Sequence, residues 1–319
     1  MGYYKKPIYI DKYNIYDIFY NDNNQLILIT PYTPNPYIIK YISDENIIQF
    51  DLYEDPDKHT IIYSLNIVNY NKNIKLIIDD SIIETIVNKY PIFNNEIIFS
   101  TIVKDEDAFI LSWIDYHLRL GVSRFIIYDN STNFTLSIIL NDYIKQNIVL
   151  LIKWDYPYRR KESGISGQTT QQNHSIYAFK NSKYIGLFDI DEYVNIQQGV
   201  SNIHQFFKNL IIKENIDVNK ISSFRLLNKF FYNPHNIPIK NNNFLSIYNC
   251  DNITKVCREK NFVIAKNVIT FAVHQVTSGK PMYNVNEKHA YFNHYFYLNK
   301  NNRGKTVTDL IDDSILKHL

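Results

Sequence analysis

The sequence predicts an α/β fold, in which a mostly parallel sheet flanked by helices follows a smaller β-rich N-terminal region. Two observations lead to this prediction. From residue 96 onward, apolar runs of strand length alternate with segments of helical periodicity. Before residue 95, short runs rich in Ile and Tyr are separated by clusters of Asn, Asp and Pro. We therefore expect a β-rich accessory region over residues 1–94 and a larger α/β domain over residues 95–319.

The apolar runs of the first region recur at spacings near ten residues, which is typical of a β-rich meander. The expected strands are Gln25–Thr30, Tyr37–Ile42, Ile47–Tyr53, Thr60–Leu65 and Ile74–Ile78. Turn-forming clusters such as Pro31–Pro36 and Asp55–Asp57 separate them. We find no catalytic constellation in this region and expect it to have an accessory or packing role.

The α/β region begins with an apolar strand, Ile97–Val103. A helix is expected over Ala108–Leu120, because its apolar side chains recur three or four residues apart, and Gly121 is suited to end it. The next strand, Arg124–Tyr128, is closed by the polar residues Asp129–Ser131. This order of elements predicts the first crossover of a parallel sheet.

Two further crossovers follow. A helix over Thr135–Lys145 leads to the strand Ile148–Trp154, and a polar loop over Tyr156–Gly167 leads to a helix over Thr169–Lys180 and the strand Tyr184–Phe188. Parallel strands end at one edge of their sheet, and ligands of α/β proteins bind at that edge. Side chains that follow these strands are therefore the candidates for a functional site.

Three of the strands are followed by acidic residues. The groups are Asp105 with Glu106, Asp129 with Asn130, and Asp189 with Asp191. Of the three Asp-x-Asp triplets in the chain, only residues 189–191 directly follow an apolar strand. Side chains two residues apart on a strand share a face, and paired carboxylates suit a hard cation such as Mg²⁺ or Mn²⁺. The sequence therefore predicts a divalent cation site at this edge.

Several classes of protein are excluded or disfavoured. The 34 basic residues balance the 32 acidic ones, so we expect no nucleic-acid partner and no binding to a membrane surface. The eight glycines form no dinucleotide-binding or P-loop motif. Cys250 and Cys257 have no partners at zinc spacing, and we interpret them as buried structural thiols. The excess of Ile, Asn, Tyr and Lys favours an AT-rich source genome, such as that of a parasite or a large DNA virus.

The sequence contains neither a recognisable signal peptide nor an apolar stretch long enough to span a membrane, and we expect a cytoplasmic protein.

Trp113 and His117 are expected to pack in the core, and His274 to have a structural role. His174 is compatible with either a helix face or the functional site. The run Arg159–Lys161 is interpreted as a solvated loop.

Several segments resemble, in their order and spacing, the motifs of glycosyltransferase family 92 and its family-2-like relatives. They are residues 104–117 and 120–131, Gly167-Gln168, Asn173-His174, residues 187–193 (LFDIDEY), and Asn293-His294-Tyr295. The resemblance covers about residues 96–300. It implies a GT-A fold and the transfer of a hexose, with inversion, from a nucleotide sugar of the UDP class to a glycan or protein-linked acceptor.

The resemblance also implies roles for individual residues. The cation, Mn²⁺ or Mg²⁺, would be bound by Asp191, Asp189 and His294. The nucleotide sugar would be held by Lys104, Glu106, Asp129, Asn130, Gln168, Asp189 and Lys300, with Arg303 or Lys305 as further contacts for the diphosphate. Inverting transfer needs a carboxylate base, and Glu259, Glu287 and Asp251 are the candidates.

Two other functions remain open at this point. A metal-dependent nucleotidyltransferase would also use carboxylates at strand ends. A non-enzymatic sugar-binding or structural protein with a decayed site is the third alternative. The presence of Asp189, Asp191 and His294 together argues against decay.

Overall fold

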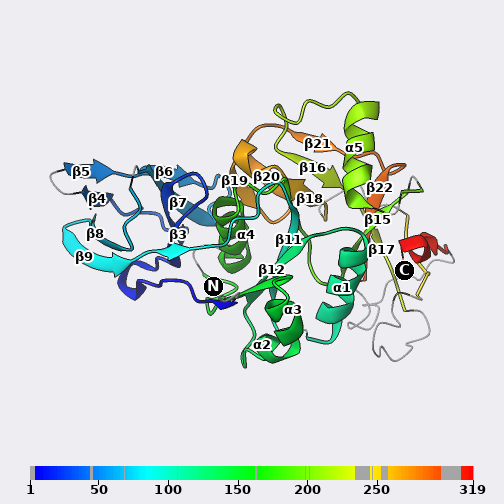
Figure 1. The fold of residues 1–319 in the computed structure, drawn as a ribbon, viewed down its shortest axis with the longest axis horizontal. Coiled ribbons are helices and arrows are strands. Elements are labelled where there is room, and N and C mark those ends of the chain that lie inside the picture. Colours follow the sequence, from blue (N-terminus) through cyan, green and yellow to red (C-terminus); the bar gives the residue numbers. More distant parts are fainter. Residues whose placement is uncertain are drawn as a thin grey trace.

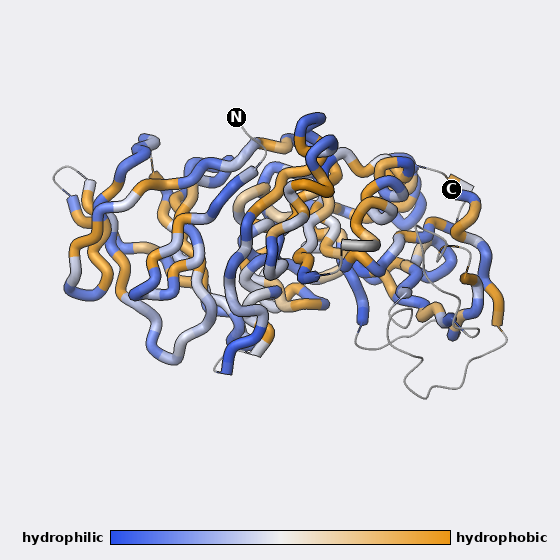
Figure 2. The backbone as a smooth tube through the Cα atoms, turned by 90° about the horizontal axis from the view of Figure 1, so that it is seen from below, coloured by the Kyte–Doolittle hydropathy of each residue, from blue (hydrophilic) through white to orange (hydrophobic). Residues whose placement is uncertain are grey.

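The computed structural model describes residues 4–43, 46–67, 69–105, 107–161, 164–197, 199–200, 202–233, 245, 247–252, 258–295 and 310–318. Over these residues the chain forms five α-helices and several β-sheets, which confirms the predicted α/β class (Figure 1). The N-terminal strands lie at one end of the molecule, beside the main sheet and its helices. Hydrophobic stretches follow the strands and helices, whereas many connecting loops are hydrophilic (Figure 2).

The main sheet has eight strands in the order β1-β13-β12-β11-β14-β18-β16-β21. Their bounds are β1 Tyr4–Lys5, β13 Val149–Lys153, β12 Arg124–Asp129, β11 Ile97–Val103, β14 Tyr184–Leu187, β18 Lys260–Val263, β16 Ser223–Leu226 and β21 Met282–Asn284. The strands from β1 to β14 run parallel, as the crossovers predict. Strand β18, however, is antiparallel to both β14 and β16, so the sheet as a whole is mixed.

The helices α1 to α4 occupy the predicted places with shifted ends, whereas α5 was not predicted. The helix bounds are α1 Asp107–Arg119, α2 Leu136–Ile139, α3 Asn141–Lys145, α4 Ser166–Ala178 and α5 Ile203–Lys213. The single helix expected over Thr135–Lys145 is divided at Leu140, whose backbone is not helical. Trp113 is fully buried, as expected. Helix α4 is buried along its whole length although most of its side chains are polar, because it packs against both the main sheet and the N-terminal strands.

The N-terminal region forms two sheets, with strand orders β10-β2-β3-β7-β6 and β5-β4-β8-β9. The bounds are β2 Asp17–Tyr20, β3 Gln25–Pro31, β4 Ile39–Ser43, β5 Asn46–Gln49, β6 Asp51–Glu54, β7 Thr60–Asn66, β8 Asn73–Ile78, β9 Ser81–Ile86 and β10 Asn88–Lys89. Every expected run forms a strand, and the run 47–53 is divided between β5 and β6. The boundary at residue 94 stays a prediction, since β1 belongs to the main sheet.

Two small sheets complete the structure. Strands β15 (Glu192–Ile196), β22 (Ala290–His294) and β17 (Asn228–Phe230) form one, and the hairpin β19 (Val268–Ala272) and β20 (Gln275–Gly279) forms the other. Short 3₁₀ turns occupy Asp11–Tyr13, Ala265–Asn267 and Ser314–His318.

In the part of the chain that the structure describes, no helix combines the length and the apolarity needed to cross a membrane. Cys250 is buried, with its Sγ 3.8 Å from the carbonyl oxygen of Leu310, whereas Cys257 lies outside the described residues.

A buried polar network joins the N-terminal region to α4. The carboxylate of Asp17 is fully buried and accepts hydrogen bonds from the hydroxyl of Tyr90 and from the side-chain amide of Asn88 (3.0 Å). It also lies 3.0 Å from Nε2 of His174, whose Nδ1 is 2.6 Å from the hydroxyl of Tyr128. His174 is therefore a core residue that fastens α4 to the N-terminal strands, and it does not reach the cleft described below.

We expect Asp17→Asn to destabilise the protein by about 3 kcal/mol. An amide at this buried position presents N–H groups to the donors of Tyr90 and Asn88, which leaves polar groups unsatisfied. The measurement is urea unfolding followed by circular dichroism. Asp51→Asn on the exposed strand β6 is the matched control and should change stability by less than about 0.5 kcal/mol. Equal stability of the two variants would contradict a structural role for the network.

His117 makes stability depend on pH. Its side chain is fully buried, with Nδ1 2.9 Å from the carbonyl of Trp113, and burial lowers its pKa to about 3. The unfolded chain binds a proton near pH 6.5 that the folded chain does not bind until about pH 3. The stability that His117 contributes is therefore complete above pH 6.5 and is lost as the pH falls from 6.5 toward 3.

Replacing His117 by Gln should consequently flatten the acid limb of the stability curve. Below pH 6 we expect the variant to lose about 1.4 kcal/mol less per pH unit than the wild type. Urea unfolding at pH 7, 6 and 5 measures this difference. His59→Gln, at a partly exposed position, provides the control. An unchanged slope in His117→Gln would show that this histidine is protonated in the folded protein.

Candidate functional site

A cleft of about 590 Å³ lies at the carboxyl ends of the parallel strands. Its wall is built from residues that follow β11, β13 and β14, together with residues next to β18, β19 and β22. The lining residues are Ile102, Val103, Lys104, Tyr158, Arg159, Ile165, Gln168, Asp189, Ile190, Asp191, Glu192, Arg258, Val273, His274 and His294. The location matches the edge that the strand order predicts for a ligand.

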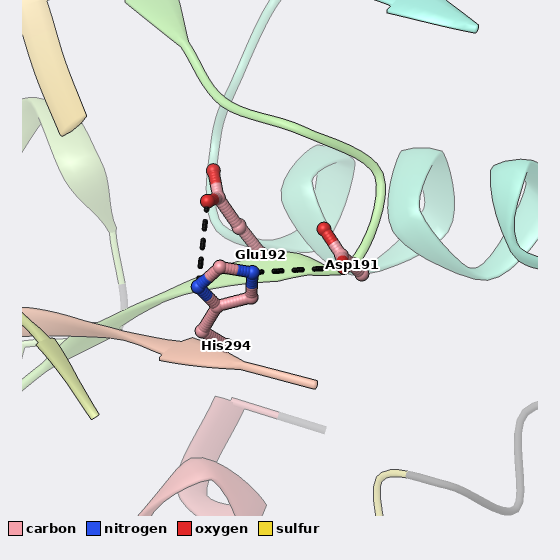
Figure 3. Close-up of side chains that lie close together, drawn as sticks. All are labelled: Asp191, Glu192 and His294. Atoms are coloured by element: carbon pink, nitrogen blue, oxygen red, sulfur yellow. Dashed lines mark ion pairs between the residues drawn. The ribbon is translucent and has the colours of Figure 1, made fainter. Parts of the chain in front are cut away.

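An acidic and histidine cluster forms one part of the cleft. Glu192 begins β15 and His294 ends β22, and these two residues are directly opposite each other in the antiparallel pair. As Figure 3 shows, the imidazole of His294 lies between two carboxylates. Nε2 of His294 is 3.6 Å from Oδ2 of Asp191, and Nδ1 is 3.7 Å from Oε1 of Glu192. The pairing of two strands about a hundred residues apart in sequence thus assembles the cluster.

The cluster is electrostatically coupled. Burial by itself would lower the pKa of His294, but the carboxylate of Asp191 outweighs burial and leaves the pKa raised. Burial would likewise raise the pKa of Asp191, and the neighbouring imidazole turns the shift into a lowering. For Glu192, burial dominates and raises the pKa to about 7. A cation bound to these groups would replace the proton on His294, since a metal ligand must be the neutral imidazole.

Lys260 connects the cluster to Asp189. Its side chain is 1% exposed, and its ammonium group lies 2.6 Å from Oδ2 of Asp189 and 3.0 Å from Oε2 of Glu192. Burial would lower the pKa of Lys260, but the two carboxylates raise it, so the lysine stays charged. Asp189 was expected to bind the cation with Asp191. The structure differs here, because Asp189 is turned toward Lys260 and Glu192 lies beside Asp191 and His294.

The lining of the cleft also includes three basic residues, Lys104, Arg159 and Arg258. Gln168, in the first turn of α4, lines the cleft as well, and its amide is 3.4 Å from Oδ1 of Asp189. The preceding Gly167 is required by packing, because a Cβ there would lie 2.5 Å from the carbonyl oxygen of Pro157. The Gly-Gln pair therefore lets the loop after β13 approach α4 while Gln168 faces the cleft.

The other predicted strand-end residues have structural partners. The carboxylate of Asp105 accepts hydrogen bonds from the backbone and the hydroxyl of Thr132. The Asn130 amide donates to the carbonyls of Trp154 and Tyr156, which ties the end of β12 to the chain after β13. Asp129 is 2% exposed and accepts a hydrogen bond from the backbone of Ser131. Neither Asp129 nor Asn130 is among the residues that line the cleft.

The three candidate bases also lie outside the cleft lining. Glu259 is buried beside Arg225, 3.7 Å away, and Asp251 accepts a hydrogen bond from the hydroxyl of Tyr232. Glu287 is exposed in the turn before β22. Four further predicted residues, Glu106, Lys300, Arg303 and Lys305, lie outside the residues that the structure describes.

Four charged or histidine residues of the cleft lining were not predicted from the sequence: Arg159, which had been interpreted as part of a solvated loop, Glu192, Arg258 and His274. Lys260, which pairs with Asp189 and Glu192, was not predicted either. A signal existed for Glu192, which follows Asp191 directly at the start of an apolar strand. Lys260 had no such signal, because it is a lysine at the beginning of an apolar run in a lysine-rich chain. His274 has its Nδ1 3.0 Å from the carbonyl of Glu259, and burial lowers its pKa to about 4. Its neutral ring forms part of the cleft wall.

The chemistry of the cluster fits a divalent cation. One ligand atom from each of Asp191, Glu192 and His294 can be chosen so that all three lie within 4.8 Å of one another. A cation about 2.1 Å from each of two ligand atoms can bridge the 3.6 Å between Oδ2 of Asp191 and Nε2 of His294. Among the described residues, Oε1 of Glu192 is buried without a hydrogen-bond partner, so this oxygen is available as a ligand or to orient His294. The mixed oxygen and imidazole set favours Mn²⁺ over Mg²⁺.

A mixed α/β fold with an acidic and histidine cluster in a cleft is compatible with the glycosyltransferase class, and a comparison with protein families identifies that class. The model of the family described as Glycosyltransferase family 92 matches residues 97–317. The chain therefore belongs to glycosyltransferase family 92, which confirms the resemblance noted in the sequence.

Curated proteins of the same family are similar over shorter segments. A family 92 protein from Oryza sativa subsp. japonica is 26% identical over 118 residues, which is 36% of this chain and 19% of that protein. One from Ricinus communis is 29% identical over 99 residues, which is 31% of this chain and 16% of its own length. One from Arabidopsis thaliana is 31% identical over 101 residues, covering the same shares of the two chains. The chain thus spans less than a fifth of the length of these relatives.

Proposed function

We propose that this chain is a metal-dependent glycosyltransferase that transfers a hexose from a UDP sugar to a glycan or protein-linked acceptor, with Mn²⁺ or Mg²⁺ as cofactor. The catalytic domain would have a GT-A-like fold, consistent with the parallel strands β13, β12, β11 and β14. The observation that carries the proposal is the cleft, in which the cluster of Asp191, Glu192 and His294 is combined with basic side chains. Family membership supports the same activity.

The residues of the cleft suit a sugar bound to a diphosphate. Asp191 and His294 would hold the cation, and Glu192 would orient His294 through its second ring nitrogen. When bound, the cation would stabilise the negative charge that develops on the diphosphate as the glycosidic bond breaks. Lys104, Arg159 and Arg258 lie in the same cleft and can neutralise phosphate oxygens. Asp189 and Gln168 are placed to accept and donate hydrogen bonds to hydroxyl groups of the donor.

Inverting transfer follows the family resemblance and requires a base beside the acceptor hydroxyl. Glu259, Glu287 and Asp251 do not line the cleft, so we assign no base among them. The nucleotidyltransferase alternative uses similar carboxylates, and the family match favours sugar transfer over it. The charged cluster argues against a decayed, non-enzymatic site.

The test combines ligand binding and turnover. With Mn²⁺ present, UDP-galactose, UDP-glucose and UDP-N-acetylglucosamine are each added to the protein, and the melting temperature and the release of UDP are measured. We expect at least one UDP sugar to raise the melting temperature and to be hydrolysed, and EDTA to abolish both effects. Stabilisation by nucleoside triphosphates alone would instead indicate a nucleotidyltransferase. No response to either class would indicate a non-enzymatic protein.

A further inference from the structure

A second cavity, separate from the cleft, lies between the N-terminal strands and the loop that follows β13. Its volume is about 90 Å³. It is lined by Tyr13, Asn14, Pro31, Tyr32, Thr33, Pro34, Tyr37 and Arg160. All of these residues except Arg160 come from the N-terminal region, for which the sequence offered only a packing role. We call this cavity the tyrosine pocket.

The tyrosine pocket and the cleft share a wall. Tyr158 and Arg159 line the cleft, and the next residue, Arg160, lines the tyrosine pocket. Two contacts hold this loop in place. The ring of Tyr156 stacks on that of Tyr16 with centroids 3.9 Å apart, and the absence of a side chain at Gly167 of α4 allows the backbone of Pro157 and Tyr158 to approach the helix. One loop therefore contributes residues to both cavities.

The pocket is preorganised. Arg160 is fixed by two contacts of one terminal nitrogen, 3.3 Å from the side-chain oxygen of Asn14 and 3.4 Å from the hydroxyl of Tyr16. The rings of Tyr13 and Tyr37 meet edge to face at a centroid distance of 5.2 Å. Two prolines stiffen the remaining side of the pocket. Side chains that are already ordered lose little entropy when a ligand binds, which favours even a small contact area.

The lining chemistry points to a sugar. A pyranose has an apolar C–H face that packs on aromatic rings, and hydroxyl groups around its edge that need donors and acceptors. The tyrosine pocket supplies both kinds of group, with rings from Tyr32 and Tyr37 and polar groups from Asn14, Thr33 and Arg160. The volume is far below the several hundred Å³ typical of nucleotide-sized sites, so it suits a single ring.

Recognition of an extended peptide is less well supported. The backbone amide of Tyr32 donates to the carbonyl of His59, and the amide of Tyr37 donates to the hydroxyl of Tyr63. Strand β3 is paired on both sides, with β2 and β7. A peptide strand therefore finds no sheet edge at β3 to extend, and recognition must come from side chains.

We propose that the tyrosine pocket is an acceptor subsite, which binds one sugar residue of the acceptor glycan while another residue of the same glycan receives the transferred hexose in the cleft. This inference rests on the proposed glycosyltransferase function and extends it to the substrate class, an oligosaccharide rather than a single sugar or a bare protein. It also gives the N-terminal region a role in specificity.

The test uses the whole chain and a printed array of defined oligosaccharides, in the presence of UDP and Mn²⁺. We expect the wild type to bind a subset of glycans, and Tyr32→Ala and Tyr37→Ala to reduce that binding at least tenfold. Thr33→Trp fills the rim of the pocket without removing a packing residue, and it should have the same effect. Tyr70→Ala removes an exposed tyrosine of the same region that lines a different cavity, and it serves as the matched control.

Transfer to a bound glycan is measured next, beside hydrolysis of the UDP sugar without acceptor. The ratio of transfer to hydrolysis should fall at least tenfold in Thr33→Trp, through a higher KM for the glycan. Absence of UDP-sugar hydrolysis would refute the proposed function and with it the acceptor role, whereas array binding that depends on the pocket would still establish the pocket as a glycan-binding site. No glycan binding by the wild type, or equal binding by Thr33→Trp, would overturn the subsite, as would binding of peptides in place of glycans.

Discussion

Asp191→Asn is expected to reduce turnover of the UDP sugar about 10³-fold. The change keeps the shape of the side chain and removes the charge that lies 3.6 Å from His294. A cation that stabilises the leaving diphosphate is worth several kcal/mol in the transition state, which corresponds to a loss of this size when its main ligand is weakened. UDP release at saturating donor measures the effect.

The same variant should bind Mn²⁺ more weakly, by at least tenfold in dissociation constant. The electron paramagnetic resonance signal of free Mn²⁺ gives this constant directly. The side chain of Asp191 is 28% exposed, so we expect the fold to tolerate the Asp191→Asn substitution. Asp155→Asn, at a side chain that is 73% exposed after β13, is the control for a general change in charge. Turnover by Asp191→Asn within tenfold of the wild type would show that Asp191 is not a cation ligand.

The Asp189→Asn variant distinguishes two roles for Asp189: a cation ligand, as the sequence suggests, or the partner of Lys260, as in the structure. If both aspartates bind the cation, as expected from the Asp-x-Asp spacing, the affinity for Mn²⁺ falls in both variants. In the structure the carboxylate of Asp189 pairs with Lys260 at 2.6 Å. We therefore expect Asp189→Asn to preserve most of the Mn²⁺ affinity.

Local patterns predicted the elements that build the cleft. Apolar runs gave the strands β11 to β14, and the crossovers gave their parallel direction. The position of Asp191 at the cleft followed from its place after β14. These features depend on residues close together in sequence, where periodicity and turn chemistry are informative. His294 was reached only through the family resemblance, since its pairing with Glu192 joins strands far apart in the chain.

The features that were missed depend on tertiary contacts. Asn130 was expected to bind the nucleotide, but its amide is used to join two strand ends. His174 was compatible with the site until the structure placed it beside Asp17, 157 positions away. Helix α4 carries no apolar stripe, because it is buried along its whole length between the main sheet, the N-terminal strands β3 and β7 and the hairpin strand β19. The hydrophobic periodicity of a single segment does not reveal which distant segments will pack against it.

The loss of Lys260 should destabilise the protein strongly. Lys260→Met removes a buried ammonium group, so that Glu192, 1% exposed and with a pKa already raised to about 7, must either remain a buried carboxylate without its cation or take up a proton. Breaking one side of a buried ion pair costs about 3–5 kcal/mol. Urea unfolding at neutral pH measures the loss, with Lys266→Met at an exposed position as the control.

The double variant Lys260→Met/Glu192→Gln tests the cause. Because it removes both charges, it should recover a substantial part of the stability that Lys260→Met loses, whereas independent effects would add. The side chain of Asp189 is 41% exposed, so water can solvate its carboxylate when the lysine is absent. The unpaired charge of Asp189 should therefore not cancel the gain in stability of the double variant. A double variant as unstable as the sum of the single variants would mean that Lys260 acts through packing. A recovery would establish that this lysine is the counter-ion that allows an acidic cluster to be buried at the cleft.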